Sequence, residues 1–212
     1  ILEKLRDEAA WAGLKVLFSD ASVPQEGEHK ILEFIRKQRA EEGYDPNLRH
    51  CIYGADADLI MLGLSTHEVH FHIIRERLEA PRPEPEGGLA ALAKRDAAGE
   101  GRTALGVSFN FVSLSFVRQF LHSFFKDVPL GFAYDLENLI DDFVLLCFVV
   151  GNDFLPKVPG FSIRLGGIDL LLAYHRHALP ELGGYLTRQG ELNLPGLEQF
   201  FKGLARSEFD LL

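Results

Sequence analysis

Residues 51–76, "CIYGADADLIMLGLSTHEVHFHIIRE", decide the fold of this chain. The segment opens with a short apolar run typical of a buried strand and continues with apolar residues at helical spacing. It ends with alternating apolar and polar residues, which is typical of a half-exposed strand. A strand, a helix and a strand in this order predict a βαβ unit and a parallel sheet.

The residues before this unit predict the same alternation. Residues 14–20, "LKVLFSD", have the pattern of a short buried strand. Residues 26–39 have the pattern of a helix, which should place Ile31, Phe34 and Ile35 on one face. Residues 1–12 also have helical spacing, and we expect Trp11 to lie in the core.

The composition changes after residue 79. Residues 80–104 are rich in Pro, Gly, Ala and mixed charges, which is typical of a flexible insertion or linker. Residues 105–212 then begin with a strand and a helix that Ser115 could cap, and continue as a mostly helical region. We therefore divide the chain into 1–79, 80–104 and 105–212.

The composition suits a folded domain without a membrane span. Of the 212 residues, 47% are hydrophobic and 11% aromatic, enough for a sizeable core. The net charge of −9 argues against a broad basic surface that grips nucleic acid through phosphates alone. No apolar run reaches the roughly 20 residues that cross a bilayer. Two buried free thiols, Cys51 and Cys147, indicate a reducing, intracellular location.

Two pairs of acidic residues follow the predicted strands. Glu26 and Glu28 flank Gly27, and Asp56 and Asp58 flank Ala57. The carboxyl ends of parallel strands meet at one edge of a sheet, where such carboxylates would repel one another. Mg²⁺ or Mn²⁺ would remove this conflict, and two such ions can clamp the oxygens of a phosphoryl transfer.

The motif "GND" could add a fifth carboxylate, Asp153, after an apolar helix. Acids at helix starts also complement the helix dipole, so spacing alone leaves metal binding and helix capping open. Lys30 could pair with a carboxylate or a phosphate, or could simply be solvated. Asn152 could cap the preceding helix or orient Asp153.

Other polar residues are weaker candidates for a metal site. Asp141 and Asp142 point about 100° apart on a helix, so one should be solvated and the other could face the site. We expect five histidines at exposed positions of a strand or helix and not in a metal cluster: His67, His70, His72, His175 and His177.

Four segments together resemble the Xrn family of 5′→3′ exoribonucleases. They are "EGEHKILEFIRKQR", "DPNLRHCIYGADADLIMLGLSTHEVHFHIIRE", "YDLENLIDDFVLLCFVVGNDFLPKVP" and "GGYLTRQGELNLPGLEQFF". The resemblance covers nearly the whole chain except residues 80–104. It implies an α/β fold with a parallel-sheet nuclease core, similar to PIN and flap nucleases, followed by a mostly helical region.

The resemblance also implies chemistry. The family degrades single-stranded RNA with a 5′-monophosphate processively, using divalent metals, and so serves RNA degradation and mRNA decay. The resemblance makes five carboxylates its metal ligands: Glu26, Glu28, Asp56, Asp58 and Asp153. Because the family's amino-terminal acids and 5′-phosphate pocket are not present, we expect a fragment of a longer enzyme that is inactive in isolation.

Two positions depart from the family pattern. Gln25 stands where the family has Gly, and would be strained if its φ is positive. Lys157 stands where the family often has His. Two alternatives stay open: a non-catalytic scaffold from a degenerate homologue, and a structure-specific endonuclease of the flap type.

Overall fold

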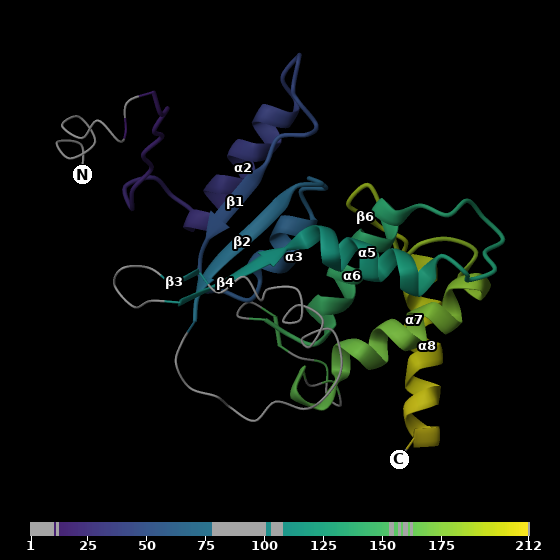
Figure 1. The fold of residues 1–212 in the computed structure, drawn as a ribbon. Helices are drawn as coiled ribbons and strands as arrows, with labels where there is room; N and C mark the ends of the chain where they lie inside the picture. Colours follow the sequence, from purple (N-terminus) through teal and green to yellow (C-terminus); the bar gives the residue numbers. More distant parts are fainter. Residues whose placement is uncertain are drawn as a thin grey trace.

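The structure is a computed structural model. It describes residue 11 and residues 13–77, 101–102, 108–152, 155–156, 158, 161 and 163–211. Within these residues the fold is mixed α/β, with a small sheet beside a group of helices (Figure 1). No helix among the described residues is long and apolar enough to cross a membrane.

The predicted strand–helix–strand unit is confirmed. It consists of β1 (His50–Tyr53), α3 (Leu59–Leu64) and β2 (Phe71–Glu76). β1 and β2 pair in parallel, with His50 opposite Phe71. Gly63 lets α3 approach β2 closely, because a Cβ atom there would lie 2.6 Å from Leu114 Cδ1 and 2.9 Å from Phe71 Cε1.

The expectation of a parallel sheet is correct for this one pairing only. β4 (Ser108–Ser113) pairs antiparallel with β2, and β3 (Gly101–Arg102) pairs antiparallel with β4. The strand order is β1-β2-β4-β3. β3 falls inside the segment 80–104, whose other residues lie outside the described part of the chain. Apolar alternation predicts a strand but not its direction, which is why the antiparallel half was missed.

The strand predicted at residues 14–20 is absent. These residues form no ladder, and Leu17 and Phe18 are 60% and 58% exposed. A strand needs a partner for its backbone groups, and β1 presents an unpaired edge within the described residues. The prediction for Trp11 was also wrong, since this side chain is 38% exposed and does not lie in the core.

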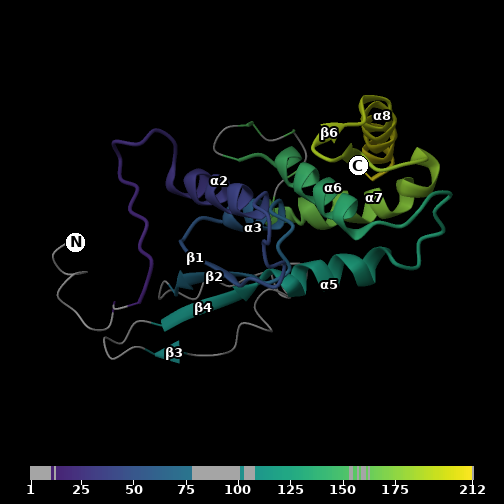
Figure 2. The same ribbon diagram turned by 90° about the horizontal axis from the view of Figure 1, so that it is seen from above.

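The predicted helix at 26–39 is confirmed as α2 (Gly27–Arg39). Its buried face holds Leu32 and Ile35, whereas Ile31 and Phe34 are exposed, so the predicted face was only partly correct. Figure 2 shows α2 and α3 on the same side of the sheet. These two helices therefore bring their amino-terminal ends to one side of β1 and β2.

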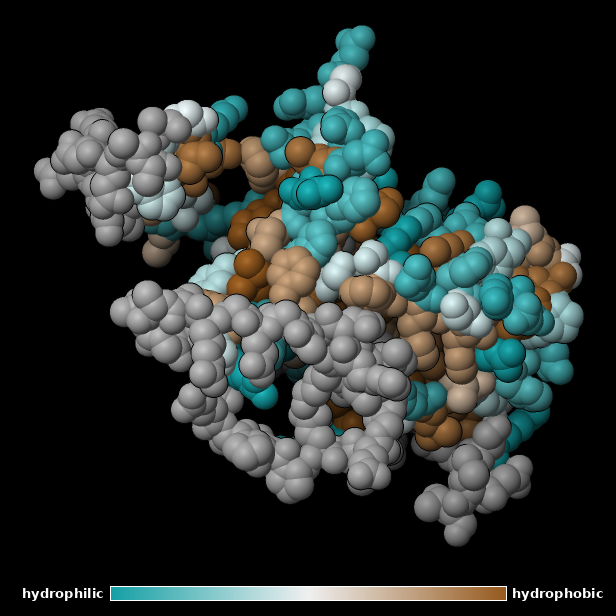
Figure 3. Space-filling model, viewed as in Figure 1, coloured by the Kyte–Doolittle hydropathy of each residue, from teal (hydrophilic) through white to brown (hydrophobic). Residues whose placement is uncertain are grey.

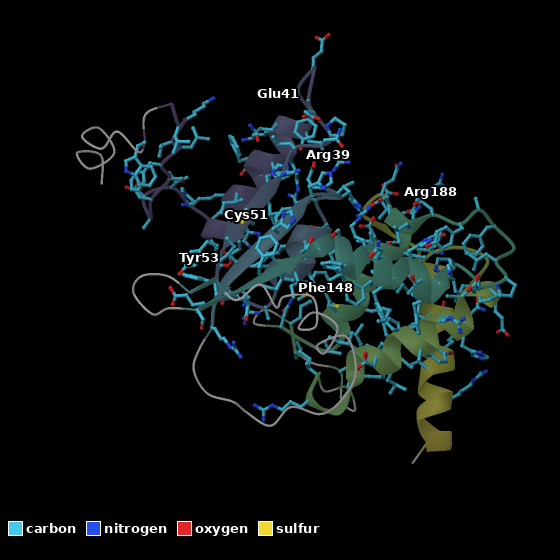
Figure 4. All side chains as sticks on the ribbon, viewed as in Figure 1. Arg39, Glu41, Cys51, Tyr53, Phe148 and Arg188 are labelled. Carbon is cyan, nitrogen blue, oxygen red and sulfur yellow. The ribbon has the colours of Figure 1, made fainter. Side chains whose placement is uncertain are left out.

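The opposite face of the sheet is open within the described residues. Cys51 and Tyr53 project from it on β1 (Figure 4), and Figure 3 shows apolar side chains at the surface in this region. Cys147 is buried as expected, but Cys51 is exposed, which corrects the prediction of two buried thiols.

The second half of the chain is mostly helical, as expected. It contains α5 (Leu114–Phe125), α6 (Leu136–Val149), the short helix η2 (Ile163–Leu165), α7 (Gly167–Leu182), the hairpin of β5 (Thr187–Arg188) and β6 (Glu191–Leu192), and α8 (Leu194–Leu211). The residue that precedes α5 is Ser113, so Ser115 does not cap it.

α6 joins two hydrophobic cores. Its Ile140 and Phe143 belong to the core beneath the sheet, whereas Leu146 and Val149 belong to the core shared with α7 and α8. A helix buried on several sides needs few polar contacts, yet Asp142 is completely buried on it. His175 on α7 is also buried, at 1% exposure, so the prediction of a surface histidine there was wrong.

Candidate metal centre

Two of the predicted ligands begin α2. Glu26 is the residue before the helix and Glu28 lies in its first turn, where the helix dipole favours negative charge. The pKa of Glu26 is raised, chiefly by a hydrogen bond with the Glu28 side chain, and also by the charges of Glu28 and Asp58. The structure therefore places Glu28 and Asp58 close enough to Glu26 for their charges to act on it.

The turn before Glu26 adopts the conformation that its motif requires. Gln25 has a φ of +87°, in the region that favours glycine. The predicted condition for strain at this position is thus met. Since only Gly reaches such a φ without cost, the strain indicates that the surrounding contacts hold the turn in place.

Asp56 and Asp58 follow β1, as expected. Asp56 is exposed, and no contact places it beside the glutamates. Asp58 precedes α3, but its side chain does not cap the helix. Its Oδ1 atom is buried and accepts no hydrogen bond from the described residues.

A divalent cation fits these donors. A buried carboxylate oxygen without a partner is costly, and the carboxylates of Glu28 and Asp58 disfavour ionisation of Glu26 and raise its pKa. Hard cations such as Mg²⁺ and Mn²⁺ prefer oxygen ligands and would remove both costs. Among the described residues, however, no three His, Cys, Asp or Glu side chains lie close enough together to hold a metal ion.

Asp153, the fifth predicted ligand, lies outside the described residues, as does Lys157. Asn152, the residue before Asp153, is held by hydrogen bonds with Leu155. Asn152 Oδ1 accepts a 2.7 Å hydrogen bond from the Leu155 amide, and the Asn152 amide donates to the Leu155 carbonyl at 3.0 Å. Gly151, with a φ of +87°, turns the chain away from α6. The Asn152 side chain therefore pairs with the Leu155 backbone.

Lys30 has a different partner from those predicted. Its Nζ donates a 2.7 Å hydrogen bond to the backbone carbonyl of Asp20. The Asp20 carboxylate in turn accepts bonds from the amide and hydroxyl of Ser22, which lower its pKa. Lys30 thus fixes the segment before Glu26 to α2 and leaves the carboxylates without a counter-charge from its ammonium group.

Neither aspartate of the pair 141–142 faces this centre, contrary to one of the expectations. Asp141 Oδ1 lies 3.0 Å from His67 Nε2. Asp142 accepts bonds from the amides of Leu186 and Thr187 at 3.0 and 2.8 Å. Both carboxylates have structural partners.

A buried ionic cluster at the other end of β1 was missed. Glu68 is 4% exposed and lies 3.2 Å from Arg39 NH1 and 3.5 Å from His50 Nε2. Figure 4 shows Arg39 at the opposite end of β1 from Tyr53. The sequence offered no signal for it, because a glutamate in a polar turn has the pattern of a solvated residue.

Comparison with protein families supports the motif assignment. The model of the "XRN 5'-3' exonuclease N-terminus" matches residues 1–77, and the model of the "Xrn1 helical domain" matches residues 133–211. The first match contains the two acidic pairs, and the second contains α6 and most of the helices that follow.

Curated relatives match almost the whole chain. The "5'-3' exoribonuclease 2" of Neurospora crassa is 44% identical over 97% of this chain and 20% of its own length. Its counterpart in Gallus gallus is 40% identical over 98% of this chain and 24% of its own length. The "5'-3' exoribonuclease 2 homolog" of Caenorhabditis elegans is 40% identical over 100% of this chain and 23% of its own length. The chain spans about a fifth to a quarter of these relatives, and it belongs to the Xrn family.

Proposed function

We propose that this chain supplies part of the active site of a metal-dependent 5′→3′ exoribonuclease, which hydrolyses single-stranded RNA with a 5′-monophosphate processively. The observation that carries the proposal is the buried, unpartnered Oδ1 of Asp58 beside carboxylates that raise the pKa of Glu26. The names of the relatives point to the same reaction.

In this proposal the metal ligands are the carboxylates after β1 and at the start of α2, together with Asp153: Glu26, Glu28, Asp56, Asp58 and Asp153. Bound Mg²⁺ or Mn²⁺, in a two-metal arrangement, would activate water and stabilise the charge that develops on the phosphate. Lys30 and Asn152 would hold the turns that present the carboxylates. The residues present orient the metal, and no side chain has to act as a nucleophile.

The architecture is part of the proposal. Residues 1–79 and the first part of 105–212 would form a core like that of PIN and flap nucleases, with the segment 80–104 as an insertion between them. We also propose that this portion is inactive without the rest of a full-length enzyme and that the enzyme works inside the cell, in keeping with the free Cys51 and Cys147.

The test is Asp58→Ala in a full-length Xrn-family protein that carries these 212 residues. We expect loss of RNA degradation by at least about 100-fold, because a metal ligand is removed. Calorimetric titration should show weaker Mn²⁺ binding. Asp127→Ala, at an exposed position after α5, is the matched control and should leave both unchanged.

Substrate choice separates this proposal from the two alternatives. A 5′-blocked RNA should resist the enzyme, whereas a flap-type endonuclease would cut it. A scaffold would neither degrade RNA nor bind Mn²⁺ at the acidic residues. Unchanged turnover in Asp58→Ala would refute the assignment of the centre.

A further inference from the structure

The imidazole of His67 lies between two carboxylates on successive turns of α6. Its Nδ1 is 2.7 Å from Glu137 Oε2, and its Nε2 is 3.0 Å from Asp141 Oδ1. A neutral imidazole has one N–H and one acceptor nitrogen, so only the imidazolium can donate to both carboxylates. The geometry therefore favours a positively charged ring that is three-quarters buried.

The backbone of His67 is shaped for this contact. Its φ is +57°, in the left-handed region, and its amide donates a 3.0 Å bond to the carbonyl of Leu64, the last residue of α3. Non-glycine residues adopt this conformation at some cost, and histidine is among those found there more often. This residue closes the end of α3, and its ring contacts α6.

Among the described residues, the charged groups that shift the pKa of His67 lie on α5 and α6. Glu137 is also bound by the Arg118 guanidinium, with one bond of 3.0 Å and a second, shorter one. The hydrogen bond that His67 donates to Glu137 and the charge of Asp141 raise the pKa of His67, against the effects of burial and of Arg118. Burial raises the pKa of Asp141, an effect that His67 partly offsets.

The turn that holds His67 is fixed on its other side as well. Arg39 NH1 donates a 2.5 Å hydrogen bond to the Thr66 carbonyl, and Glu68 is buried against Arg39. The carboxyl end of α3 is therefore tied to both α2 and α6. Asp58 immediately precedes the first residue of this six-residue helix, which is only about 9 Å long.

His67 joins α3, which begins directly after the proposed ligand Asp58, to α6. α3 begins after Asp58, and α6 leads through Gly151 to Asn152, the residue before Asp153. α3 packs against both α6 and β2. If α3 shifted along α6, Asp58 at its amino-terminal end would move with it. The contact of one imidazolium with two carboxylates resists such a shift.

We propose that His67 is a positioning residue for the nuclease reaction: it locks the end of α3 to Glu137 and Asp141 of α6 and so fixes the place of Asp58. This inference rests on the proposed function, because it assumes that Asp58 holds a metal. His67 itself touches neither metal nor RNA in this role.

The test compares His67→Gln with His70→Gln in a full-length protein that carries this chain. His70 lies three residues further along the chain, and among the described residues its ring has no hydrogen bond or ion pair. For His67→Gln we expect kcat to fall about tenfold, KM for RNA to stay the same, and half-saturation to need several times more Mg²⁺. His70→Gln should match the wild type in all three.

A pH profile separates positioning from a general loss of folding. As pH rises, the wild-type His67 loses its proton and its second carboxylate contact, so the ratio of wild-type to His67→Gln turnover should approach one. The ratio should be largest at neutral pH and below. Circular dichroism at each pH checks that both proteins remain folded. A ratio that stays constant across the profile would overturn the role assigned to the imidazolium.

Two further variants make the result decisive. If His67→Gln does not fold, Asp141→Asn takes its place, since it keeps the shape of the contact and removes one charge; wild-type Mg²⁺ dependence in that variant would overturn the proposal. If Asp58→Ala is inactive while His67→Gln turns over like the wild type, positioning is refuted and the nuclease assignment stands. If Asp58→Ala is fully active, both fail.

Discussion

The carboxylate of Asp142 lies 3.1 Å from Nε2 of His175, and the two side chains are 0% and 1% exposed. The same carboxylate accepts hydrogen bonds from the Leu186 amide and from the amide and hydroxyl of Thr187. One buried side chain on α6 therefore joins α7 and β5. Buried carboxylates in native proteins are paired, and Asp142 meets this requirement through contacts to two other elements.

Removing the Asp142 carboxylate should destabilise the fold strongly. Asp142→Ala leaves the amides of Leu186 and Thr187 buried without acceptors, and we expect the free energy of unfolding to fall by about 3–5 kcal/mol. Urea unfolding measures the change. Thr187→Val, which removes the hydroxyl bond alone, should cost about 1 kcal/mol. A loss below that value in Asp142→Ala would show that water replaces the carboxylate.

Gln25 offers the opposite case, a substitution that should stabilise. Its φ of +87° is costly for any residue with a Cβ, and Gln25→Gly should raise the free energy of unfolding by up to about 1 kcal/mol. Gln189 is the control, because its φ of +52° lies within the ordinary left-handed region. Gln189→Gly should change stability little. Equal effects at the two positions would argue against strain at Gln25.

Local patterns predicted the central unit of the fold because its signals are local. The apolar run at β1, the helical spacing in α3 and the alternation in β2 each depend on near neighbours. The late helices were predicted for the same reason. Residues 14–20 have an equally good strand pattern, but a strand also needs a paired edge, and no pattern within these seven residues shows whether that edge is available.

The candidate centre was predicted from spacing and resemblance, and the structure adds what spacing could not show. It places the charges of Glu28 and Asp58 near Glu26, while Asp56 stays exposed. The roles of His67 and His175 depend on contacts with residues 70 and 33 positions away, respectively. Such pairings follow from how helices pack, which a single sequence does not reveal.

Glu137 should make the protein sensitive to acid. Burial opposes its ionisation, but the hydrogen bonds from His67 and Arg118 prevail and lower its pKa to about 2, from 4.5. A lowered carboxyl pKa stabilises the fold above 4.5, and that contribution is lost as the pH falls from 4.5 through about 2. Because Glu137 is half-exposed, solvent screening reduces its worth to about 1 kcal/mol.

Urea unfolding at a series of pH values checks this. In Glu137→Gln the slope of stability against pH between 4.5 and 2 should be shallower than in the wild type. Glu33 is the matched control, since its pKa is lowered by an exposed pair with Lys37. Glu33→Gln should alter the slope much less. Identical slopes in wild type and Glu137→Gln would contradict the strong pairing with His67.

Glu26 should report directly on metal binding. Its pKa is raised, first by the hydrogen bond with Glu28, so without metal its ionisation destabilises the fold and stability recovers as the pH falls through this pKa. Mg²⁺ between the carboxylates should lower the Glu26 pKa, as measured by carbon-13 NMR titration of the side-chain carboxyl. Glu28→Gln should lower it without metal and weaken the response to Mg²⁺. Glu33 should not respond, and an unchanged Glu26 at saturating Mg²⁺ would exclude it as a ligand.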